Sequence, residues 1–159
     1  MDGFTRMKVS PNSAATCSSN KLLAHVESDM KSVSKSNGRQ QTVCILDDDA
    51  SVVKATSRLL SSAGWMVDSF TDPIEFLDHA RTCQPRVVVL DILMPKMSGL
   101  EVQKRLRSIS PKSRVIILTS NDDPKVRDEA MYTGAAAFFI KPVDDDEFIA
   151  GIEAAFSRS

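Results

Sequence analysis

The sequence lacks the features that mark several classes of protein. It holds three cysteines, an odd number, with no C-x-x-C pair, so their spacing gives no metal-binding or redox motif. No apolar run approaches the roughly 18 residues that a membrane-spanning helix needs, and the N-terminus has no continuous apolar core of a signal peptide. The formal net charge of −1 gives no overall attraction to DNA or to a membrane surface. We therefore expect a cytoplasmic protein that does not enter a membrane.

The first 40 residues differ in composition from the rest of the chain. They contain eight serines, almost no aromatic residues, and six basic against three acidic side chains, whereas residues 41–159 hold fourteen basic against eighteen acidic side chains. A segment like the first cannot bury enough apolar surface to offset the entropy lost on ordering. We expect a disordered N-terminal tail at residues 1–40, with a short docking helix at residues 21–30 as the alternative, and one domain at residues 41–159.

Residues 41–159 alternate between short apolar runs and amphipathic segments. The apolar runs are typical of buried parallel strands and cover residues 43–46, 65–70, 86–90, 114–118 and 136–140. Several of the segments between them open on helix-capping sequences, namely Asp72-Pro73, Ser98-Gly99 and Asp123-Pro124. Five strand–helix repeats predict an α/β fold with a parallel sheet and right-handed crossovers.

Chemically active side chains stand directly after four of the predicted strands. Asp47 and Asp48 follow the first strand, Asp91 the third, Thr119 the fourth and Lys141 the fifth. In open α/β sheets, ligands bind beyond the carboxyl ends of the strands. Taken alone, each of these residues has an ordinary explanation as a helix cap, a turn residue or a solvated lysine. Their joint placement at one edge of the sheet favours a shared site.

The residue types at this edge suit phosphoryl transfer. Neighbouring carboxylates repel one another unless a cation neutralises them, and oxygen ligands of this kind suit Mg²⁺. A carboxylate can also act as a nucleophile and form an acyl phosphate, a reaction that depends mainly on neutralising charge. We therefore predict Asp91 as the nucleophile, Asp47 and Asp48 around Mg²⁺, and Thr119 and Lys141 as the groups that hold the phosphate oxygens.

Four motifs, in order and at a characteristic spacing, carry a resemblance to a known family. They are Ile45-Leu46-Asp47-Asp48-Asp49, the segment from Leu90 to Gly99, Leu118-Thr119-Ser120, and Gly134-Ala135-Ala136 with Ile140-Lys141-Pro142. Through them, residues 41–157 resemble the receiver domains of bacterial two-component response regulators. The resemblance implies a flavodoxin-like (βα)5 fold, which is a three-layer sandwich around a five-stranded parallel sheet with strand order 2-1-3-4-5.

The resemblance also implies a phosphoacceptor and a metal site. Asp91 would be phosphorylated by a sensor histidine kinase or a histidine phosphotransfer protein. Mg²⁺ would be bound by Asp48 directly, by Asp47 through water, by Asp91, and by the backbone carbonyl of Leu93. The protein would take up and slowly lose its own phosphoryl group and would not be a multiple-turnover enzyme.

A conformational switch is implied by the same resemblance. Thr119 would hydrogen-bond the phosphoryl group and Lys141 would pair with it, with the Lys141–Pro142 peptide in the cis form. Phe138 occupies the position of the family's switch aromatic and would turn into the space that Thr119 vacates. Because Phe138 has no hydroxyl, its rotation cannot gain a hydrogen bond at the ring tip, and a plain core phenylalanine is the alternative interpretation.

The output of the switch is expected to be a contact with another protein. The chain ends at Ser159, directly after the last predicted helix, so we expect a stand-alone signalling protein without direct DNA binding. The resemblance implies a surface formed by the fourth helix, fifth strand and fifth helix, at about residues 124–157, for a downstream protein or a homodimer. Two alternatives are the receiver portion of a transcription regulator that lacks its DNA-binding domain, and an aspartyl-phosphate phosphatase. Leu93 counts against the phosphatase, because those enzymes carry a second acid at that position.

Overall fold

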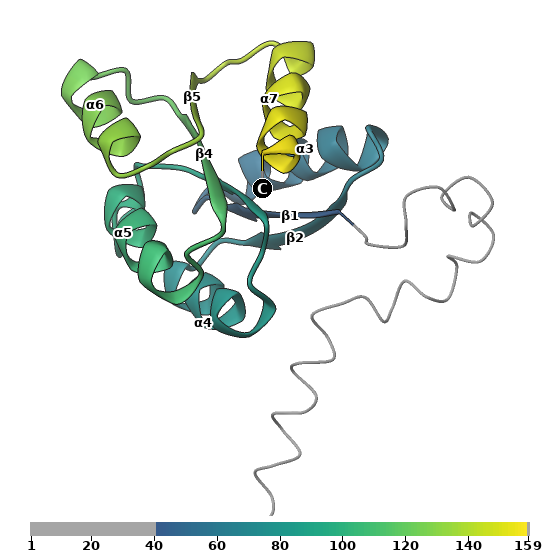
Figure 1. The fold of residues 1–159 in the computed structure, drawn as a ribbon. Helices are drawn as coiled ribbons and strands as arrows, with labels where there is room; N and C mark the ends of the chain where they lie inside the picture. Colours follow the sequence, from purple (N-terminus) through teal and green to yellow (C-terminus); the bar gives the residue numbers. More distant parts are fainter. Residues whose placement is uncertain (1–40, 159) are drawn as a thin grey trace, which may run out of the picture. The chain divides into compact units, whose positions relative to one another are not determined.

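The computed structural model describes residues 41–158. The tail predicted at residues 1–40, with its alternative docking helix, lies outside the described residues. Strands and helices alternate five times along the described part of the chain (Figure 1). The strands are β1 (Thr42–Leu46), β2 (Met66–Phe70), β3 (Val87–Leu90), β4 (Arg114–Thr119) and β5 (Ala137–Ile140). The helices are α3 (Ala50–Ser62), α4 (Pro73–Cys83), α5 (Gly99–Ile109), α6 (Pro124–Tyr132) and α7 (Asp145–Ser157).

Each helix begins at a side chain that caps its free backbone amides. The carboxylate of Asp72 accepts hydrogen bonds from the amides of Ile74 and Glu75, and Pro73 occupies the first turn of α4. The other four helices are capped in the same way by Asp49, Ser98, Asp123 and Asp144. Within residues 41–158, no helix has the length and apolar character needed to cross a membrane.

The five strands form one parallel sheet with the order β2-β1-β3-β4-β5, so the predicted fold class is confirmed. Its register aligns the strand ends: Leu46 of β1 lies beside Leu90 of β3, and Thr119 of β4 lies beside Ile140 of β5. The strands predicted to start at residues 65, 86 and 136 each start one residue later. For β2 the reason is visible, because pairing with β1 starts at Met66.

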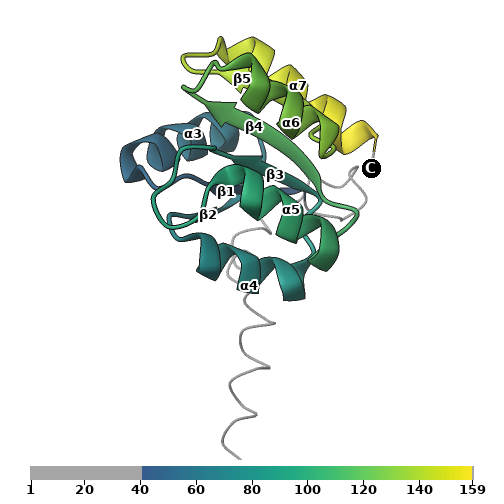
Figure 2. The same ribbon diagram turned by 90° about the vertical axis from the view of Figure 1, so that its left-hand side faces the viewer.

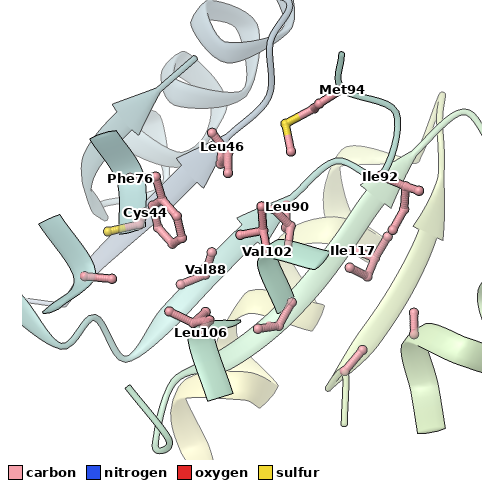
Figure 3. Packing of buried hydrophobic residues seen from close by; sticks show 14 of the residues in the cluster. Cys44, Leu46, Phe76, Val88, Leu90, Ile92, Met94, Val102, Leu106 and Ile117 are labelled. Carbon is pink, nitrogen blue, oxygen red and sulfur yellow. The ribbon is translucent and has the colours of Figure 1, made fainter. Parts of the chain in front are cut away.

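Two apolar layers hold the helices against the two faces of the sheet (Figures 1 and 2). One layer joins the sheet to α3 and α7, with Leu60, Phe148 and Ile152 fully buried. The other layer joins it to α4, α5 and α6, and Figure 3 shows part of it around Phe76 and Leu106. The sheet is therefore covered on both faces, and its carboxyl-end edge remains available for a site.

Candidate functional site

The predicted site residues meet at the carboxyl ends of the neighbouring strands β1, β3, β4 and β5. The ammonium Nζ of Lys141 lies 2.8 Å from Oδ2 of Asp47 and 3.9 Å from Oδ1 of Asp91. Asp47, Asp91 and Thr119 are buried, with exposed fractions of 4%, 6% and 0%, while the Lys141 side chain is 23% exposed. The sheet produces this convergence, because the four strands are parallel neighbours and each residue directly follows or ends its strand.

Three carboxylates form an acidic cluster beside this lysine. One carboxylate oxygen from each of Asp47, Asp48 and Asp91 lies within 4.8 Å of the other two. Asp48 is exposed, so the cluster opens to solvent on one side. Oδ1 of Asp91 is buried and has no hydrogen-bond partner among the described residues, which leaves an oxygen that a cation could satisfy. This donor set fits a hard divalent cation such as Mg²⁺.

Burial and a neighbouring negative charge both act on Asp91. Desolvation raises the pKa of the Asp91 carboxyl, and the charge of Asp47 raises it further. The ammonium of Lys141, the hydroxyl of Thr119 and the backbone amide of Leu93 act in the opposite direction, but the pKa remains above its ordinary value. A bound cation would reverse this balance, because it favours the ionised carboxylate.

Backbone and side-chain hydrogen bonds fix the residues that surround Asp91. The Thr119 carbonyl accepts a hydrogen bond of 2.8 Å from the amide of Lys141, and the Thr119 hydroxyl accepts one of 3.2 Å from the amide of Asn121. The Lys141–Pro142 peptide is cis, as the sequence resemblance implied. Oδ1 of Asp47 accepts a 2.9 Å hydrogen bond from the amide of Asp49, which leaves Oδ2 to face Lys141.

Adjacent aromatic residues of β5 face opposite sides of the sheet. Phe138 is 7% exposed and packs in the layer under α4, α5 and α6, with the guanidinium of Arg127 5.3 Å from its ring centroid. Phe139 packs in the other layer, with its ring centroid 5.8 Å from that of Phe148 on α7. The ring of Phe138 is thus turned inward, which is compatible with both a resting switch and a plain core residue.

Two features of the loop after Asp91 were missed by the sequence analysis. A Cβ atom added to Gly99 would overlap the backbone carbonyl oxygen of Asp91, so the start of α5 packs directly on the site. The ammonium of Lys96 lies 2.6 Å from Oδ2 of Asp72, which joins this loop to the start of α4. Gly99 was recognised as a helix start and as the end of the Leu90–Gly99 motif, but neither reading predicts its contact with the Asp91 backbone, and nothing in the sequence pairs Lys96 with a residue so far away along the chain.

Comparison with protein families agrees with this geometry. Residues 43–153 match the family described as the response regulator receiver domain. The chain belongs to this family. These residues are therefore a receiver domain, the signalling domain of two-component response regulators, and the match does not support the phosphatase alternative.

Curated relatives of this receiver are response regulators. TodT of Pseudomonas putida is 34% identical over 117 residues, which cover 74% of this chain and 52% of TodT. The transcriptional regulatory protein FixJ of Azorhizobium caulinodans is 38% identical over 117 residues, which cover 74% of this chain and 56% of FixJ. The chain thus spans about half the length of the curated relatives it matches.

Solved structures share the same fold. The chemotaxis protein CheY4 of Vibrio cholerae matches with a TM-score of 0.68 and 26% identity, covering 74% of this chain and 99% of that one. The structure titled FixJ-N matches with a TM-score of 0.71 and 32% identity, covering 76% of this chain and 97% of that one. The likeness therefore spans nearly the whole of these solved chains.

Proposed function

We propose that Asp91 is the phosphoacceptor of this receiver and that its phosphorylation switches a protein-binding surface. The observation that carries the proposal is the environment of Asp91. Its carboxylate is buried at the sheet edge, its Oδ1 has no hydrogen-bond partner within residues 41–158, and it lies beside both an acidic cluster and the Lys141 ammonium. The donor would be the phosphohistidine of a sensor histidine kinase or a histidine phosphotransfer protein, and the exchange would take place in the cytoplasm.

The transfer exchanges one bond to phosphorus for another. A carboxylate oxygen of Asp91 attacks the phosphorus atom, an O–P bond forms, and the P–N bond to the donor imidazole breaks with its electron pair returning to nitrogen. Asp47, Asp48, Asp91 and the carbonyl of Leu93 would hold Mg²⁺, which when bound neutralises charge on the phosphoryl oxygens. The burial of Asp91 and Thr119 limits the access of water to the acceptor side of the site.

Lys141 and Thr119 would then respond to the new charge. The Lys141 ammonium is held by Asp47 but is only 3.9 Å from Asp91, so a phosphoryl group on Asp91 offers it a second anionic partner within a short movement. Thr119 would turn its hydroxyl toward the phosphoryl oxygens, and Phe138 would follow. The surface formed by α6, β5 and α7 would carry the change to a partner protein or a second copy of the chain. The exposed Met131 and Tyr132 at the end of α6 support this assignment.

Phosphorylation by a small donor tests the proposal directly. We expect the full chain, incubated with acetyl phosphate and Mg²⁺, to gain one phosphoryl group by intact-protein mass spectrometry. The Asp91→Asn variant, and the wild type without Mg²⁺, should show none. Asp78→Asn serves as the control, because Asp78 is exposed on α4 and should label like the wild type. Labelling of Asp91→Asn at the wild-type level would show that another group is the acceptor.

The role of Lys141 can be separated from that of Asp91. We expect Lys141→Ala to accept a phosphoryl group, because the nucleophile and acidic cluster remain, but to lose the change in amide hydrogen exchange that phosphorylation causes along α6. The exposed Lys125 provides the control, and Lys125→Ala should keep the wild-type response. If exchange along α6 in Lys141→Ala still changes as in the wild type, Lys141 has no part in the switch.

A second candidate is supported by the lengths of the relatives. Because the chain spans about half of TodT and FixJ, it could be the receiver portion of a transcription regulator whose DNA-binding part is not in this sequence. The mass of the native polypeptide in a cell extract distinguishes the two. A mass of 17.4 kDa supports a stand-alone receiver, and a clearly larger mass supports the regulator.

A further inference from the structure

A second cluster of metal-ligand side chains lies away from the phosphorylation site, between the sheet and α4. Cys44 of β1 and Asp68 of β2 are direct register partners in the parallel sheet, so their side chains project from the same face. His79 comes from α4, which covers that face. One ligand atom from each of the three residues lies within 4.8 Å of the other two. Cys44 precedes Asp47 by three residues, roughly 10 Å along the strand, so this cluster is separate from the acidic one.

The geometry of His79 fits a metal ligand. Its Nε2 lies 3.4 Å from Oδ2 of Asp68. This is about the separation of two ligands on a tetrahedral zinc ion with bonds of roughly 2.0–2.1 Å. Nε2 is buried and makes no hydrogen bond to any described residue. The opposite ring nitrogen, Nδ1, lies 3.7 Å from Sγ of Cys83, and the ring packs 4.8 Å from that of Phe70, so the imidazole is oriented with Nε2 toward Asp68.

The charges and ligand types of the cluster match zinc. A cysteine thiolate and an aspartate carboxylate carry two negative charges, which balance one Zn²⁺, while histidine binds as the neutral imidazole. Mixed sulfur, nitrogen and oxygen ligands favour this borderline-soft metal over Mg²⁺, which takes oxygen ligands. Cys44 is fully buried, but the Asp68 side chain is 35% exposed, so water can reach the fourth position from that side. Figure 3 shows Cys44 beside Phe76 in the apolar layer.

We propose that Cys44, Asp68 and His79 form a zinc site with water as the fourth ligand. The site joins β1, β2 and α4 through side chains. The capping residue of α4, Asp72, also holds Lys96 of the loop after Asp91. Zinc binding therefore stabilises the helix to which that loop is attached.

Cobalt, which absorbs visibly at tetrahedral sites, provides the test. The reduced full chain is titrated with Co²⁺ while excess Mg²⁺ occupies the acidic cluster. We expect one Co²⁺ per chain, a thiolate-to-cobalt absorption band in the near ultraviolet, and its loss when Zn²⁺ is added. Cys44→Ser should abolish the band. Asp68→Asn and His79→Gln should each weaken Co²⁺ binding by more than about 100-fold, beyond the usual effect of losing an outer-shell partner.

Controls separate this site from other ligands in the chain. Cys17→Ser and Asp91→Asn should keep the band and the affinity of the wild type. Asp68 and His79 are partly exposed, so their variants should fold even if Cys44→Ser, checked by circular dichroism, does not. A wild type with no thiolate band, or an unchanged affinity in His79→Gln, would overturn the proposal.

Discussion

Gly99→Ala is expected to lower the free energy of unfolding by about 3 kcal/mol or more, at the upper end of the range for overpacked sites. The added Cβ atom would overlap the carbonyl oxygen of Asp91 and lie 2.8 Å from Cα of Ile92. Both neighbours are backbone atoms and cannot rotate away, unlike the end of a flexible side chain. The start of α5 must therefore move away from Asp91, and phosphorylation of Asp91 should slow in the same variant.

Gly64→Ala is the matched control for this substitution. Gly64 has a φ of +98°, and a Cβ atom there meets nothing within 4 Å. Gly64→Ala should lower the free energy of unfolding by about 1–2 kcal/mol, and this loss should come from the left-handed backbone alone. Urea unfolding of both variants compares the two effects. If Gly99→Ala is no less stable than Gly64→Ala, the backbone of Asp91 and Ile92 can move away from the added Cβ atom at little cost, and the prediction is wrong.

Asp91→Asn is expected to make the protein more stable at neutral pH in the absence of a divalent metal. Burial and the charge of Asp47 raise the pKa of Asp91 in the folded state. The folded protein then holds a proton on Asp91 at pH values where the unfolded chain, with an aspartate pKa of about 3.9, has lost it. Stability therefore falls as the pH rises from about 4 through the raised pKa. Asparagine removes this loss of stability. The free energy of unfolding of Asp91→Asn should therefore exceed that of the wild type at pH 7, and the difference should vanish near pH 4.

Magnesium should make the wild type more stable than Asp91→Asn, the reverse of the order expected without metal. A ligand that binds only the folded state adds about 2.7 kcal/mol to the free energy of unfolding when its concentration is about 100 times its dissociation constant. The wild type and the Asp78→Asn control should gain this amount, whereas Asp91→Asn should gain much less because its cluster has lost one carboxylate. Unfolding curves with and without Mg²⁺ provide the measurement. An equal gain in Asp91→Asn would remove Asp91 from the metal site.

The positions of Asp47, Asp91, Thr119 and Lys141 at one edge of the sheet could be predicted from the sequence. Apolar runs identify buried strands, and parallel strands place the residues that follow them at the same edge. The strand starts were less predictable, since they depend on where a neighbouring strand begins. Trp65, predicted to open the second strand, instead stacks on Phe156 of α7 with ring centroids 4.7 Å apart.

Contacts between distant segments could not be predicted in this way. Lys141 lies nearer to Asp47 than to Asp91, a preference that depends on side-chain placement at the sheet edge. The approach of His79 to Cys44 and Asp68 depends on both the β1–β2 register and the seating of α4. A sequence pattern fixes which face of an element is apolar, but it does not specify which polar groups will meet on that face.

The alternation of Phe138 and Phe139 along β5 has a consequence for how a signal could leave the domain. Within residues 41–158, β5 is an edge strand with a neighbour on one side only, so its backbone has more freedom to shift than a central strand. Under the proposed switch, rotation of the Phe138 ring alters packing in the layer beneath α4, α5 and α6, whereas a shift of the strand also displaces Phe139 against Phe148 of α7. Partner proteins that bind α6 and partner proteins that bind α7 would then respond to different parts of the same conformational change. A single receiver could in this way signal to more than one partner.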